Sequence, residues 1–145
     1  MERDQALKFM YDLLRLMAQD RCDFSITFRR LAGFSAWADA PGHRLLRDLF
    51  IDRAGFDAWA TRYADRLALE GGNDVERAQR MNAVNPKFVL RNHLAEVAIR
   101  DAQAGDFAEV TRLLKVLSRP FDEHTGEGVD AYAGFPPDWA QTIEV

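Results

Sequence analysis

Apolar residues recur along this chain at the spacing of an α-helix. Between residues 5 and 18 they stand three or four positions apart, which predicts a helix with one apolar face turned to a core. Further runs of this kind follow as far as Pro120, and Phe24, Ile26 and Phe28 also alternate in the manner of a short strand. The apolar positions of the first four runs are Leu7, Met10, Leu14 and Met17; Phe24, Phe28 and Leu31; Leu45, Leu46, Leu49 and Phe50; and Phe56, Trp59, Tyr63 and Leu67. The pattern predicts an all-α protein, with a short strand at residues 24–28 as the alternative.

Capping residues and breaks show where these helices should begin and end. Asp23 can cap the second helix, and Pro41-Gly42 indicates a loop before the third. Gly71-Gly72 should end the fourth helix, because glycine readily adopts the left-handed conformation found after helix C-termini. Asn85-Pro86 is typical of an N-cap followed by the first helical residue, and this helix should run to about Gln103.

A last helix is predicted between Gly105 and Pro120. Asp106 stands at its N-cap position, and Glu109 three residues later completes the pattern of a capping box. The apolar positions of this helix are Phe107, Val110, Leu113, Leu114 and Leu117. The chain is thus predicted to form an irregular bundle of about six helices that ends near residue 119.

The final segment, residues 120–145, differs from the helices before it. It contains no Lys or Arg, and its glycine and proline residues prevent long regular structure. By formal count residues 73–119 carry a net charge of about +2 and residues 120–145 about −6. The aromatic residues of the segment are Phe121, Tyr132, Phe135 and Trp139. We therefore expect an acidic, aromatic strap (residues 120–145) that lies against the face carrying Lys87, Arg91 or Arg112.

Composition narrows the class of protein. A chain of 145 residues with 48% hydrophobic residues fits one domain, residues 1–145, with a core of its own. The 19 basic and 23 acidic residues disfavour nucleic acid as a partner, and Asp106 and Glu109 would repel phosphate at the start of a DNA-reading helix. The single Cys22 excludes an internal disulfide and suits a reducing compartment. No apolar run is long enough for a membrane span or a signal peptide, so we expect a cytoplasmic protein without membrane contact.

Residue patterns for catalysis are missing from the sequence. No glycine-rich loop that could cradle phosphates occurs, and none of the serines lies in a nucleophile-elbow sequence. His93 and Glu96 stand three residues apart on a predicted helix and could share a metal, but a solvated His93 is the simpler interpretation. His43 and His124 are expected in loops. We therefore assign no catalytic, cofactor-binding or metal-binding residue to this chain.

One helix departs from the simple pattern. On a helix that starts at Pro86, Lys87 and Arg91 would fall inside an apolar arc of roughly 200°. The apolar members of that arc are Phe88, Leu90, Leu94, Ala95, Val97, Ala98, Ile99 and Ala102. A charge in such a place must be paired or must lead to a second surface. Two interpretations stay open: a structural salt bridge with the acidic strap, or a contact to another domain or to a ligand held by it.

The same residues carry a family resemblance. Met81–Leu94 reads M-N-A-V-N-P-K-F-V-L-R-N-H-L, which resembles the M-N-x-x-N-P-K-[YF]-x-L-R-N-x-L segment of the SelO (selenoprotein O-like, YdiU-type) family. Tyr11–Leu31, Gly105–Glu123 and Pro136–Ala140 are similar, in the same order, to the D-L-L…F-x-R-R-L, G-D-[FY]…R-P-[FY]-D-E and P-P-x-W-A stretches of that family. The resemblance spans nearly the whole chain.

The resemblance implies a longer parent protein with a protein-kinase-like fold. Such proteins transfer AMP from ATP to Ser, Thr or Tyr hydroxyls of target proteins with a divalent metal, Mg or Mn. Their nucleotide- and metal-binding motifs belong to an earlier part, and none of those motifs occurs here. The resemblance therefore implies that this chain is the C-terminal helical part of a protein adenylyltransferase and is not an enzyme by itself.

The resemblance also identifies candidate interface residues. Asn85, Lys87, Arg91 and Asn92 belong to the motif and are candidates for a polar seam against the kinase-like part. The expected partners are that kinase-like part and the protein substrates of the parent enzyme. The alternative function is a free-standing helical adaptor that binds a protein or peptide in a groove.

Overall fold

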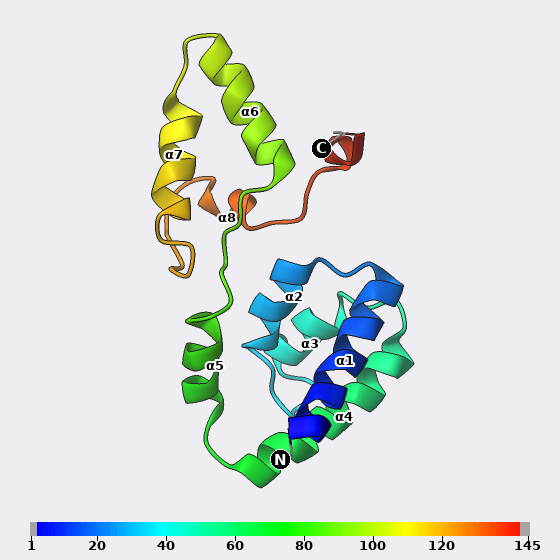
Figure 1. Ribbon diagram of the computed structural model, residues 1–145. Coiled ribbons are helices and arrows are strands. Elements are labelled where there is room, and N and C mark those ends of the chain that lie inside the picture. The colour runs from blue at the N-terminus through cyan, green and yellow to red at the C-terminus, as the bar shows by residue number, and fades with distance from the viewer. Residues whose placement is uncertain (1–2, 143–145) are drawn as a thin grey trace. The chain divides into compact units, whose positions relative to one another are not determined.

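Residues 3–142 are described by a computed structural model, and every regular element in that range is helical (Figure 1). The all-α prediction is confirmed, and the alternative of a strand at residues 24–28 is wrong because these residues are helical. The chain divides into two compact units, a first unit up to Met81 and a second unit from Asn82 onwards. The assignment of residues 1–145 to a single domain stays a prediction.

The first unit is built from four helices, and a fifth helix, α5, ends at the boundary. Figure 1 shows them in blue to green. The helices are α1 (Arg3–Asp20), α2 (Phe24–Leu31), α3 (Pro41–Arg47), α4 (Arg53–Glu70) and α5 (Asp74–Asn82). The sequence pattern did not predict α5, since none of its residues is buried and it therefore lacks an apolar stripe. Asn73 starts this helix by accepting a hydrogen bond from the N–H of Glu76 at 2.8 Å.

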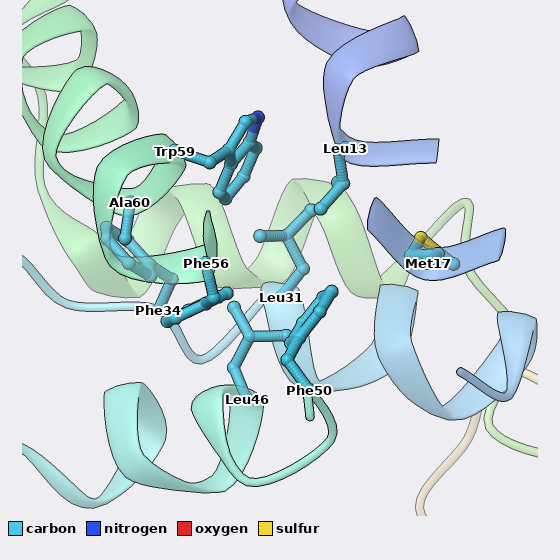
Figure 2. Packing of buried hydrophobic residues seen from close by; sticks show 9 residues of the cluster. All are labelled: Leu13, Met17, Leu31, Phe34, Leu46, Phe50, Phe56, Trp59 and Ala60. Carbon is cyan, nitrogen blue, oxygen red and sulfur yellow. The ribbon is translucent and has the colours of Figure 1, made fainter. Parts of the chain in front are cut away.

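The core of the first unit lies where α1 to α4 converge. Figure 2 shows its nine buried side chains, among which the rings of Phe50 and Phe56 stack at 4.9 Å. The nine are Leu13, Met17, Leu31, Phe34, Leu46, Phe50, Phe56, Trp59 and Ala60. The stripe predicted for residues 5–18 is only partly inward: Met17 is buried, whereas Leu7 and Met10 are 46% and 43% exposed.

Several predicted helix ends agree with the structure, and one does not. Asp23 caps α2 by accepting the N–H of Ile26 at 3.0 Å, and Gly71 follows α4 with a φ of 71°. Pro41-Gly42 was predicted to be a loop, and this prediction is wrong. The two residues form the first turn of α3, where a proline costs no backbone hydrogen bond because an N–H at that position would have no partner within the helix. A Cβ on Gly42 would stand 1.8 Å from the carbonyl oxygen of Gly33, so this glycine allows α3 to approach the end of α2.

The second unit contains α6 (Asn92–Gln103), α7 (Ala108–Leu117), the single-turn α8 (Val129–Tyr132) and a 3-10 turn, η1 (Asp138–Thr142). Helices α6 and α7 pack on each other as a helical hairpin (Figure 1). The strap is thus less irregular than predicted, because α8 and η1 interrupt it. None of the helices in residues 3–142 is long and apolar enough to cross a membrane.

The predicted capping box of α7 does not form. Asp106 accepts the N–H of Ala108 at 3.0 Å, and the N-cap position is taken by Phe107. Glu109 turns instead to Arg112 and to the strap. Glu109 therefore binds the side chains of Arg112 and Tyr132 in place of the backbone N–H that the capping box would have supplied.

Candidate functional site

The segment Met81–Leu94 connects two helices, the end of α5 and the start of α6. Helix α6 starts at Asn92, with Arg91 at the N-cap in extended conformation (φ −101°, ψ 150°), so the predicted start at Pro86 is wrong. The helical wheel that placed Lys87 and Arg91 inside one apolar face is wrong for the same reason, since both residues precede the helix.

Contacts with the strap explain why residues 83–91 are not helical. The backbone N–H groups of Lys87 and Phe88 both donate to the carbonyl oxygen of Pro120, at 2.9 and 3.2 Å. The Phe88 side chain is 1% exposed, and its ring meets the ring of His124 edge-on at 5.3 Å. Burial of a whole phenylalanine contributes about 1.5–3 kcal/mol, whereas an N-cap residue contributes about 0.5–2 kcal/mol, so burial of Phe88 together with the two hydrogen bonds to Pro120 favours the non-helical conformation.

The Lys87 side chain fastens the strap to this segment. Its Nζ donates to the carbonyl oxygen and to Oε2 of Glu123, at 3.0 and 2.9 Å, and lies 3.6 Å from Oδ1 of Asp130. The ammonium also stands 5.4 Å from the centre of the Phe88 ring. The side chain of Lys87 is only 18% exposed. For Lys87, the interpretation as a structural salt bridge with the acidic strap is confirmed.

The other three candidate residues surround this contact without sharing one helical face. Asn85 and Arg91 are half-buried in the segment before α6, and Asn92 is exposed as the first residue of that helix. Arg91 and burial together lower the pKa of His93, burial being the larger cause. The interface role predicted for Asn85, Lys87, Arg91 and Asn92 stays a prediction.

A second tie joins the strap to α7. The hydroxyl of Tyr132 donates to Oε2 of Glu109 at 2.9 Å, and Arg112 binds the same carboxylate. Burial and this hydrogen bond raise the pKa of the Tyr132 phenol. The strap therefore reaches the surface of Arg112, as predicted, although through Glu109.

A third contact involves α6. The ring of Trp139 meets that of His93 at 6.0 Å with the two planes almost perpendicular. His93 is 7% exposed, so the interpretation of a solvated His93 is wrong. The strap thus contacts the non-helical segment before α6, helix α6 itself and helix α7.

In the first unit, the groups with possible chemistry are occupied by structural contacts. His43 lies in α3 and not in a loop, and its Nδ1 is 3.0 Å from the carbonyl oxygen of Ser35. The thiol of Cys22 donates to the carbonyl oxygen of Leu49 at 3.2 Å, and burial followed by the charge of Asp20 raises its pKa to about 11. Such a thiol stays protonated near neutral pH and is a poor nucleophile.

A cleft of about 580 Å³ lies over α3 and α4 of the first unit. It contains the ion pair of Arg47 and Asp57, which are joined by two hydrogen bonds of 2.7 and 3.0 Å. The hydrogen bond raises the pKa of Arg47 and lowers that of Asp57. Within residues 3–142, no three His, Cys, Asp or Glu side chains converge in a way that could hold a metal ion.

Sequence reasoning did not single out the individual partners of this segment. Glu123 was counted only among the acidic residues of the strap, His124 was expected only in a loop, and the carbonyl of Pro120 has no signature in the sequence. The opposite charges of residues 73–119 and 120–145 were the signal that led to the right surface.

Comparison with known proteins shows which family the chain resembles. The model of the family described as "Protein adenylyltransferase SelO" matches residues 1–118. Among curated proteins, the chain is similar to a "Protein nucleotidyltransferase YdiU" of Burkholderia ambifaria, with 53% identity over 148 residues that cover 100% of this chain and 27% of that protein. A protein of the same name from Paraburkholderia xenovorans is 56% identical over 133 residues, which cover 92% of this chain and 25% of that protein. That of Burkholderia pseudomallei strain K96243 is 53% identical over 145 residues, with coverage of 100% and 27%.

The chain therefore spans about a quarter of the length of the curated relatives that it matches. It corresponds to one part of a larger nucleotidyltransferase, as the resemblance of Met81–Leu94 and the three accompanying stretches implied. Because the family model matches 118 of the 145 residues, the chain belongs to the SelO family.

Proposed function

We propose that this chain serves as the C-terminal, non-catalytic helical part of a SelO-like protein adenylyltransferase. The parent enzyme would transfer AMP from ATP, with Mg or Mn, to Ser, Thr or Tyr hydroxyls of protein substrates. ATP and metal would be held by the kinase-like part of the parent and not by this chain. The chain would support that part and help to shape the surface that meets the protein substrate.

One observation carries this proposal. The relatives named as protein nucleotidyltransferases match the chain over its whole length, yet the match covers only 27% of their own length. In a protein built this way, a helical part is expected to act through its contacts with the remainder. The C-terminal position is what the resemblance implies, because the nucleotide- and metal-binding motifs of the family belong to an earlier part and none of them occurs here.

The segment from Asn85 to Asn92 is the proposed polar seam against the kinase-like part. The structure supports a division of labour within it. Lys87 holds the strap, whereas Asn92 is exposed at the start of α6. In this proposal Lys87 shapes the seam through the strap, and Asn85, Arg91 and Asn92 contribute polar groups to it.

The proposal is tested with a chimera. This chain replaces the matching segment of the Burkholderia ambifaria relative, and transfer of AMP from ATP to protein is measured for the chimera, the intact relative and the relative without the segment. We expect the chimera to label protein at a rate comparable with that of the intact relative, and the shortened protein to be inactive or unstable. A folded chimera without activity would contradict the proposal.

A second measurement addresses the chain alone. Calorimetry with ATP and Mg should give no binding, and incubation with labelled ATP should leave the chain and added proteins unlabelled. Tight binding of ATP, or labelling by the isolated chain, would show that it contains a nucleotide site and would overturn the non-catalytic role.

A further inference from the structure

Apolar side chains at helix α7 fall into a buried group and a group left exposed by residues 3–142. Leu113 and Val116 are 6% and 3% exposed and form the inward face. Val110 and Leu114 on α7 are 41% and 66% exposed, and Phe107, at the N-cap position just before the helix, is 61% exposed. The sequence pattern predicted one stripe made of Phe107, Val110, Leu113, Leu114 and Leu117. Of these five residues, Leu113 is buried, Leu117 is half-buried and the other three are exposed.

The exposed side chains occupy neighbouring positions. Val110 and Leu114 stand four residues apart on α7, so their side chains lie above one another along the helix, and Phe107 stands at the N-cap three residues before Val110. Single exposed apolar residues are ordinary, but a row that includes a phenylalanine is typical of a surface that another protein part covers. We call this row, Phe107–Val110–Leu114, the α7 stripe.

The polar groups beside the α7 stripe are already satisfied inside α7. The hydroxyl of Thr111 donates to the carbonyl oxygen of Phe107 at 3.1 Å, and that of Ser118 donates to the carbonyl oxygen of Leu114 at 2.6 Å. Covering the stripe would therefore leave neither hydroxyl without a hydrogen bond. This is the property that an apolar docking surface needs, because a stranded polar group costs about 1–3 kcal/mol.

The occupant that we infer for the stripe is the remainder of the longer protein. The SelO family model matches residues 1–118, a range that includes all of α7. The curated relatives contain about three quarters of their length outside the region that this chain matches. We propose that the α7 stripe is the surface on which the remaining, kinase-like part of a SelO-like protein packs. This inference rests on the proposed function and adds the place of contact to it.

The experiment uses the chimera with the Burkholderia ambifaria relative. A photoreactive benzophenone amino acid replaces Leu114 in one version and Leu69 in a control version, since Leu69 is an 81% exposed leucine on α4. After irradiation, mass spectrometry identifies the attached peptides. We expect the probe at position 114 to attach to peptides outside the grafted chain, and the probe at position 69 to do so much less.

A second arm measures affinity. A protease site placed before the grafted chain allows the peptide link between the two parts to be cut. The dissociation constant of the two parts is then measured for the unchanged chimera, Leu114→Gln and Leu69→Gln. Loss of one buried leucine side chain should weaken the association about tenfold or more. Leu69→Gln should leave it unchanged within about twofold.

The outcomes separate this inference from the proposed function. Attachment of the position-114 probe to residues 3–81, attachment to a second copy of the protein, or no attachment would overturn the α7 stripe as the docking surface. Equal affinities of Leu114→Gln and the unchanged chimera would do the same. If AMP transfer by the chimera persists in any of these cases, the proposed function stands and only the surface is wrong. If a folded chimera with the position-114 attachment transfers no AMP, the docking surface stands and the proposed function fails.

Discussion

Replacing Lys87 by methionine tests whether this residue holds the strap. Methionine keeps an unbranched side chain that can pack along the Phe88 ring, but it removes the ammonium that binds Glu123 and approaches Asp130. The backbone N–H groups of Lys87 and Phe88 remain able to donate to Pro120. The substitution therefore removes one group from a contact whose other parts are kept.

The expected loss follows from the exposure of the two partners. Lys87 is 18% exposed but the Glu123 side chain is 69% exposed, so the ion pair should contribute only about 0.2–1 kcal/mol, as pairs near the surface do. The hydrogen bond from Nζ to the carbonyl oxygen of Glu123 adds about 0.5–1.5 kcal/mol. Asp130 is 94% exposed at 3.6 Å and should add little. A total of about 1–2 kcal/mol corresponds to an opening of the strap that is about 5–30 times more frequent.

Amide hydrogen exchange measures this opening directly. The N–H groups of Lys87 and Phe88 are protected by Pro120, so their exchange should accelerate by that factor in Lys87→Met. Lys115→Met on the exposed side of α7 is the matched control and should leave the exchange of both amides unchanged. In a double-mutant cycle, Glu123→Gln should lose most of its effect once Lys87 is replaced. Equal exchange in Lys87→Met and the unchanged protein would refute the role of Lys87 in holding the strap.

Three further predictions concern the second unit. Phe88→Ala should destabilise it by about 3–5 kcal/mol, because a fully buried ring is lost, whereas Phe107→Ala at an exposed position should cost less than about 1 kcal/mol; urea unfolding followed by circular dichroism distinguishes the two. His93 has a pKa lowered below its usual value near 6.5, so the unfolded chain binds a proton more readily and stability should fall as the pH drops below about 6.5; His93→Gln should flatten that slope in unfolding measured from pH 5 to 8. A chain that ends at Arg119 uncovers Phe88 and should show a lower melting temperature and lower solubility, and unchanged values for both would contradict the docked strap.

The fold was predictable where local patterns and burial agree. The periodic runs that became α1, α2 and α4 include core residues such as Met17, Leu31 and Phe56, and the caps at Asp23 and Gly71 depend on neighbours in the sequence. Helix α5 was not predictable from periodicity because its stability does not come from a buried stripe. Its cap at Asn73 was the remaining sequence signal.

The candidate site was predictable in its charges but not in its geometry. The acidic composition of the strap predicted its contact with Lys87, because opposite charges can be recognised in the sequence without knowing the backbone conformation. The start of α6 was mispredicted because Asn85-Pro86 has good local statistics, whereas the actual conformation depends on Pro120, more than thirty residues later. A helical wheel contains only neighbours within one helix, so it cannot predict a contact between residues so far apart in the sequence.

The position of Lys87 changes how the family-like motif is best understood. A lysine inside a helical apolar face would have needed either a salt bridge with the acidic strap or a partner on a second surface, and the second possibility was one reason to expect an interface there. In the structure the charge is satisfied by Glu123 within the same unit, so that reason no longer holds for Lys87. Exposed apolar side chains of the second unit include Phe107, Val110 and Leu114 at α7. In the proposed arrangement Lys87 holds the strap, and the α7 stripe meets the remainder of the longer protein.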